Sequence, residues 1–206
     1  PSAFARDWAR DHYGVDFSAV QWVLQAKEVF PVHDSNLRIE YVDDSKSMAQ
    51  RLIAGELDAI LTDISDTKMY RDLESNPQIR RLFPDYLSED RRLYRETGIF
   101  TPVHMIIMSR KPDQAHPELA AKFYGAFEKA KELAYDDISS DRGGFSVVYL
   151  RERMKEQMAD WGDPWKYGVR ANKATLDAFI KYNVEQGMIR AAPAYADIFA
   201  AGTLDT

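Results

Sequence analysis

The sequence predicts an α/β fold in which a short parallel sheet precedes a helix-rich second half. Between residues 37 and 61 the pattern runs strand, helix, strand with connections of a few residues, a rhythm typical of parallel strand pairing. After residue 110 the apolar residues recur mainly with the period of a helix. The 206 residues, 45% of them hydrophobic, suffice for the core of one large domain or two small lobes.

The elements of the first half follow from apolar spacing and from the residues that begin and end each element. Ser2 precedes a helical pattern that Gly14 terminates, and Gly55 ends the helix that Asp44 or Ser45 opens. Alternating or compact apolar runs predict the strands. In order, we expect a helix over 2–13, strands over 20–23 and 37–41, a helix over 45–53, and a strand over 57–61.

From residue 65 onward the sequence predicts mostly helices and loops. Residues 65–88 are polar and contain two prolines, which predicts a loop with a short helix. Residues 100–109 depart from the helical pattern. Their apolar run predicts the strongest strand in the sequence. The expected helices cover 89–96, 117–135, a segment ending near 158, 173–186 and 193–200. We expect the loop over 161–169 to be anchored in the core by the rings of Trp161, Trp165 and Tyr167.

Charge and composition exclude several classes of function. The chain has 33 acidic and 27 basic residues, a net charge of -6, and its basic residues are interleaved with acids, so we expect no nucleic-acid partner. No apolar run approaches the ~20 residues that span a bilayer, so we expect no membrane insertion. The absence of cysteine excludes disulfides, thiolate catalysis and cysteine-bound zinc.

The beginning of the chain predicts that upstream sequence is missing. The chain starts at Pro1 without an initiator methionine and enters a helix cap at Ser2 directly. Any signal peptide would lie upstream, so the compartment is left open.

Five segments resemble the 4,5-dihydroxyphthalate decarboxylase family and its relatives among the substrate-binding proteins of ABC transporters. The most specific are RLFPDYLSEDRRLYRETGIFTPVHMIIMSR at 81–110 and DPWKYGVRANKATLDAFIKYNVEQGMI at 163–189. HPELAAKFYGAFEKAKELA at 116–134, AFARDWARDHYGV at 3–15 and GELDAIL at 55–61 add to the resemblance. One departure is Thr101 before Pro102, where the family usually has GIFP-x-x-H.

The resemblance implies a type II periplasmic-binding-protein-like α/β fold, with two lobes, a ligand cleft between them and an incomplete first lobe. Residues 1–99 would form the α/β lobe two, and residues 100–206 a crossing strand and helices that return to lobe one. From the pattern alone, a single compact α/β domain stays open as an alternative.

His104 is the candidate catalytic residue. It lies in the apolar run VHMIIM, and the resemblance places this run as the strand that crosses between lobes and faces the cleft. An imidazole titrates near neutrality and can protonate a ring carbon or bind a phenolic oxygen. The alternative is a core histidine that is hydrogen-bonded to a backbone carbonyl.

Arg6 is the main candidate for binding a carboxylate. It lies in the first turn of the opening helix, where backbone N–H groups favour anions, and Ser2 could donate beside it. Arg95 and Thr97 precede the run of His104 and could complete the clamp, and Thr62 follows a predicted strand at its carboxyl end. The alternatives are solvated side chains, such as an Arg6 paired loosely with Asp7 or Asp11.

Two functions stay open. The first is the non-oxidative decarboxylation of a dihydroxylated aromatic diacid, which needs no organic cofactor and would take place in the cytoplasm. A divalent ion could contact the two hydroxyl groups of the substrate, but no motif in the sequence supports one. We therefore expect no dedicated metal site. The second is a periplasmic solute-binding protein for a small anionic or aromatic ligand. The expected partner is a small aromatic carboxylate, and homo-oligomerisation is left open.

Overall fold

The structure is a computed structural model that describes residues 2–25, 37–62, 66–101, 104–140, 142 and 144–206. By its internal contacts the chain divides into two compact units. Unit 1 comprises residues 1–86 and 182–190, and unit 2 comprises residues 87–181 and 191–206.

Unit 1 begins with the predicted opening helix, α1 (Ser2–Tyr13). Gly14 ends this helix at φ +67° and donates its N–H to the carbonyl of Arg10 at 3.0 Å, as the sequence predicts. Phe4 is buried and meets the ring of Tyr182 edge-on, with 5.5 Å between the ring centroids. This contact joins the first and last segments of unit 1.

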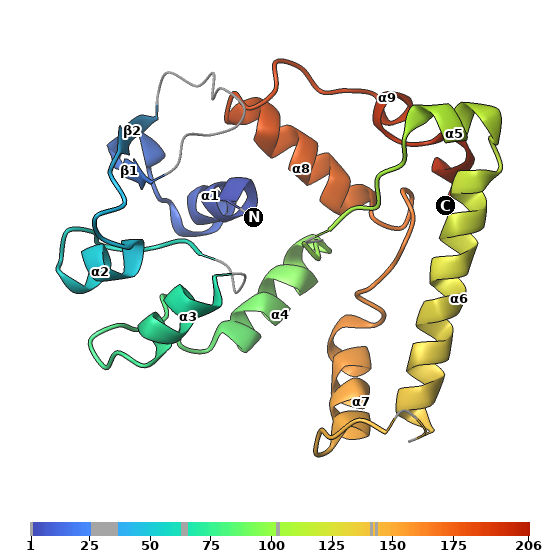
Figure 1. The fold of residues 1–206 in the computed structure, drawn as a ribbon, viewed down its shortest axis with the longest axis horizontal. Coiled ribbons are helices and arrows are strands. Elements are labelled where there is room, and N and C mark those ends of the chain that lie inside the picture. The colour runs from blue at the N-terminus through green and yellow to red at the C-terminus, as the bar shows by residue number, and fades with distance from the viewer. Residues whose placement is uncertain (1, 26–36, 63–65, 102–103, 141, 143) are drawn as a thin grey trace. The chain divides into compact units, whose positions relative to one another are not determined.

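The sheet of unit 1 has two parallel strands. A 3-10 turn, η1 (Phe17–Ala19), leads into β1 (Gln21–Leu24), which pairs with β2 (Arg38–Tyr41) in the register Gln21↔Arg38. Figure 1 shows the two strands side by side. Both strands were predicted to within one residue, and their pairing is parallel, but the predicted strand at 57–61 is wrong. Residues 57–61 have no regular structure, and Leu61 is half-exposed.

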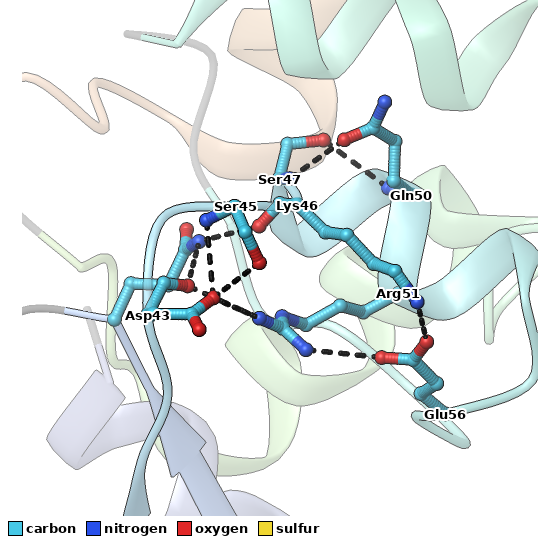
Figure 2. A network of polar contacts seen from close by, with 8 residues as sticks. Asp43, Ser45, Lys46, Ser47, Gln50, Arg51 and Glu56 are labelled. Atoms are coloured by element: carbon cyan, nitrogen blue, oxygen red, sulfur yellow. Dashed lines mark hydrogen bonds and ion pairs between the residues drawn. The ribbon is translucent and has the colours of Figure 1, made fainter.

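The helices that complete unit 1 are α2 (Met48–Ile53) and α3 (Thr67–Glu74). Ser47 caps α2 through a capping box with Gln50, so the helix begins three residues after the predicted start. Figure 2 shows the polar network beside this cap. Arg51 bridges Asp43 at 3.1 Å and Glu56 at 3.0 Å, and this pairing of opposite charges ties the turn after β2 to α2.

Unit 2 consists of helices in the part that the structure describes. They are α4 (Tyr86–Thr97), which starts at the last residue of unit 1, α5 (Arg110–Ala115), α6 (Leu119–Ser139), α7 (Leu150–Trp161), residues 173–181 of α8 (Lys173–Glu185), α9 (Tyr195–Ile198) and the 3-10 turn η2 (Ala201–Thr203). In Figure 1, α7 runs beside α6, which it contacts. The predicted helix over 173–186 is confirmed, with Gly187 at φ +67° after its end.

Several half-buried aromatic rings pack against one another in unit 2. Trp161 lies 4.9 Å from Tyr94 and 5.7 Å from Phe100 between ring centroids, and its carbonyl accepts a hydrogen bond from the Tyr94 hydroxyl at 3.0 Å. The expected anchoring of the 161–169 loop by its rings is therefore confirmed for Trp161. Trp165 also meets Phe100, at 5.1 Å, but its surface is half-exposed.

An ionic clip attaches the same loop to α6. Asp163 accepts hydrogen bonds from Lys131 Nζ at 2.9 Å, from the Tyr135 hydroxyl at 2.9 Å and from the Trp165 backbone N–H at 3.0 Å. Burial by itself would raise the pKa of Asp163, but these hydrogen bonds outweigh it and hold the pKa below the ordinary value. The carboxylate therefore stays ionised and bound to Lys131.

The prediction of a type II periplasmic-binding-protein-like fold is wrong. The structure is 53% helical, and its described residues contain only a two-stranded parallel sheet, whereas that fold would have a larger mixed sheet. The two runs expected to widen the sheet do not form strands. Residues 57–61 and the described part of 100–109 have no regular structure, and Ile107 is 92% exposed. An apolar run does not form a strand unless neighbouring strands pair with its backbone.

Candidate functional site

The side chain of Arg6 is held in a defined orientation within unit 1. Its Nε donates to the side-chain oxygen of Gln186 at 2.6 Å, and its Nη2 lies 3.9 Å from the sulfur of Met188. The guanidinium carbon lies 5.4 Å from the ring centroid of Trp22 in β1, within the range of a cation–π contact. A neutral amide, a thioether and an indole ring are among the groups that hold this cation.

The next residue, Asp7, is the most deeply buried residue of the described chain, at 1% exposure. Its carboxylate accepts a hydrogen bond from the Gln186 side-chain NH₂ and pairs with Arg10 at 2.6 Å. Arg10 also pairs with Asp11 at 2.7 Å and Glu185 at 2.9 Å. Burial raises the pKa of Asp7, although the Gln186 hydrogen bond and the charge of Arg10 oppose the rise.

A hollow of about 450 Å³ opens beside these side chains, entirely within unit 1. Its volume lies in the range of ~300–1,000 Å³ that is usual for sites of small ligands. Arg6 and Arg10 contribute two positive charges to its wall, and three carboxylates face them. The lining residues are Arg6, Asp7, Arg10, Gly14, Val15, Asp16, Phe17, Ser18, Leu37, Glu185 and Gln186.

The carboxylates of the wall are themselves bound to protein groups. Asp7 and Glu185 pair with Arg10, as described above. Asp16 caps η1 and accepts hydrogen bonds from the Ser18 hydroxyl at 2.7 Å and the Ser18 N–H at 2.9 Å. These two bonds lower the pKa of Asp16, so it is ionised at neutral pH. The wall thus combines the guanidinium groups of Arg6 and Arg10 with carboxylates that are ion-paired or hydrogen-bonded to protein groups.

Three of the residues predicted to bind substrate belong to unit 1. Arg6 lines the hollow. Ser2 is the first residue of α1, and its side chain lies outside the described part of the structure. Thr62 is half-buried in a segment without regular structure and does not line the hollow.

The other predicted site residues belong to unit 2. Arg95 is exposed on α4, with its guanidinium 3.5 Å from Asp160. The Thr97 hydroxyl donates to the Leu93 carbonyl at 2.6 Å and accepts from the Ile99 N–H at 3.1 Å, so it binds the end of α4. His104 is exposed in a segment without regular structure, which differs from both the predicted strand and the alternative of a core histidine.

Sequence reasoning missed Asp7 and Gln186 as members of this site. Asp7 was considered only as a loose surface partner of Arg6, and Gln186 only as the end of a helix. A signal was present in the spacing, because Asp7 lies three residues after Phe4 and so shares the buried face of α1. Gln186, by contrast, is 180 residues from Arg6 along the chain, and no local pattern predicts their contact.

The described ranges of the chain contain no group of three or more His, Asp or Glu side chains placed to hold a metal ion. They also contain no helix with the length and apolar character needed to cross a bilayer.

Comparisons with known proteins do not identify a family for this chain: no protein-family model matches it, and no curated protein matches it significantly.

Proposed function

We propose that the chain binds a small organic acid, with the ligand carboxylate at Arg6 in the hollow of unit 1. The observation that carries the proposal is the placement of Arg6, which lines the hollow while Gln186, Met188 and Trp22 contact its guanidinium. A held guanidinium loses little freedom on binding, and its positive charge attracts a carboxylate.

An aromatic acid is the favoured ligand class. The resemblance to the 4,5-dihydroxyphthalate decarboxylase family implies an aromatic diacid. The hollow adds apolar surface from Val15, Phe17 and Leu37, which suits one face of a ring. The carboxylates in the wall disfavour a second negative charge near them, so we expect one carboxylate of the ligand to lie at Arg6 and the other to reach water.

The reaction that the resemblance implies is decarboxylation, and we propose it as the activity of the full protein. In this reaction an acid, for which the resemblance suggests His104, protonates the ring carbon that bears the carboxylate. The electron pair of the breaking C–C bond would then restore the aromatic ring, and CO₂ would leave. Exposure of the imidazole is compatible with this role. Without turnover, the same binding would serve the solute-binding function. The enzyme would work in the cytoplasm and the binding protein in the periplasm.

Calorimetric titration with phthalate and 4,5-dihydroxyphthalate tests the binding. We expect Arg6→Ala to weaken both by more than about tenfold, because the site loses a charge-assisted hydrogen-bonding partner. Arg153→Ala is the matched control, since Arg153 pairs with Glu156 on α7 and both are exposed. Benzamide, which is aromatic but uncharged, should bind weakly to all three proteins.

The outcomes separate the two functions. Equal affinities of the Arg6→Ala protein and the wild type would show that Arg6 does not bind the ligand. Release of CO₂ from 4,5-dihydroxyphthalate would support the enzyme. Tight binding without turnover by the complete protein would leave only the solute-binding function.

A further inference from the structure

A side-chain amide lies between the Arg6 guanidinium and the buried Asp7 carboxylate. Gln186 follows α8 directly and is 7% exposed. Its oxygen accepts from Arg6 Nε at 2.6 Å, and its NH₂ group donates to Asp7 Oδ2. We infer that Gln186 is the positioning residue that sets the charge preference of the hollow, an inference that rests on the proposed binding of an organic acid at Arg6.

The two neighbours of Gln186 require opposite ends of its amide. A guanidinium only donates hydrogen bonds, whereas an ionised carboxylate only accepts them. The amide oxygen must therefore face Arg6 and the NH₂ group must face Asp7. Asp7 is itself held by Arg10 at 2.6 Å, so this order of contacts fixes the amide and, through it, the Arg6 side chain.

The neutrality of the amide matters for the ligand. A glutamate at position 186 has the same shape but would place a negative charge at the position that now lies 2.6 Å from Arg6 Nε. Whatever its other contacts, Arg6 would then attract an anion in the hollow less strongly. The same glutamate would face Asp7, another carboxylate, where an NH₂ group now donates.

A double variant moves a negative charge within the site without adding one, so it tests whether the position of that charge matters. In Asp7→Asn/Gln186→Glu, the asparagine NH₂ can donate to the new carboxylate, so a donor again faces an acceptor. The net charge of the protein is unchanged, because one negative charge moves from position 7 to position 186. We expect this variant to keep a folded spectrum but to bind phthalate more than about tenfold more weakly than the wild type.

Two further variants complete the comparison. Gln186→Glu alone should lose phthalate affinity and also unfold at a lower temperature, because two carboxylates then face each other. Gln78→Glu adds the same charge at an exposed residue of unit 1 and should change neither property. Phthalate affinity of the double variant equal to that of the wild type would overturn the inference while leaving the proposed function intact. A wild-type protein that does not bind phthalate would overturn both.

One measurement on the wild type does not depend on whether any variant folds. The Arg6 Nε proton should exchange with water at least about tenfold more slowly than that of the exposed Arg153, because Gln186 accepts it. Equal exchange of the two protons, measured by NMR on arginine-labelled protein, would show that Gln186 does not hold Arg6 and would overturn the inference.

Discussion

Replacing Asp163 by alanine should release the 161–169 loop of unit 2 from α6. The carboxylate accepts three hydrogen bonds, from Lys131, Tyr135 and Trp165, and the side chain of Lys131 is only 12% exposed. Hydrogen bonds to a charged group contribute about 1.5–3 kcal/mol each when they are buried. Because Asp163 itself is 29% exposed, we expect a total loss of about 3 kcal/mol for Asp163→Ala. Asp163→Asn keeps an acceptor oxygen but loses the ion pair, so about 1–2 kcal/mol should be lost.

The assay is urea unfolding of the complete chain at pH 7, followed by tryptophan fluorescence. Glu132→Gln is the matched control, because Glu132 forms an exposed pair with Lys129 on the same helix and should matter by less than about 0.5 kcal/mol. A cost for Asp163→Ala that is no larger than that of the control would refute the assignment of this clip.

The pH dependence of the unfolding free energy of Asp163→Asn gives a second test. The folded-state pKa of Asp163 is lowered, so its contribution to stability is present above the ordinary carboxyl value of 3.8 and is lost as the pH falls through the folded value. The difference in unfolding free energy between the wild type and Asp163→Asn should therefore be constant near neutrality and shrink below pH 3.8. A difference that grows on acidification would contradict the sign of this shift.

Three further predictions concern other residues. Phe4→Ala should lower the free energy of unfolding by about 3–5 kcal/mol, because it removes the buried ring that meets Tyr182; a loss below 1 kcal/mol in urea, about the cost of a surface change, would contradict this packing. Gly168→Ala should lower the thermal midpoint, since Gly168 has φ +98° and an added Cβ would lie 2.6 Å from the Thr206 carbonyl carbon; an unchanged midpoint would argue against this close approach. His104→Ala should abolish CO₂ release and leave phthalate affinity within about twofold, and continued release would remove His104 from the reaction.

The elements that the sequence predicts well are bounded by local signals. Gly14 and Gly187 adopt positive φ after α1 and α8, as their places after apolar helical patterns suggest. The strand β1 is a short apolar run and β2 a short alternating run, and both lie within one residue of their predicted places. Each of these predictions depends on residues within one or two turns of the chain.

The failed predictions depend on distant partners. Residues 57–61 and 100–109 have strand-like composition, but a strand also needs neighbouring backbone to bond, and composition does not reveal whether it is present. The larger sheet inferred from them through a family resemblance was therefore wrong. The candidate site shows the same division: Arg6 was predicted from its helical position, whereas Gln186 became visible only in the structure.

Mapping of phthalate binding by NMR tests the central claim most directly. On titration of the isotope-labelled chain, the backbone signals of residues 14–18 and 185–186 and the Arg6 side-chain signal should shift together and saturate with a single affinity. Benzamide at the same concentrations should leave them in place. Shifts confined to other residues, or none with either compound, would show that the hollow beside Arg6 does not bind organic acids.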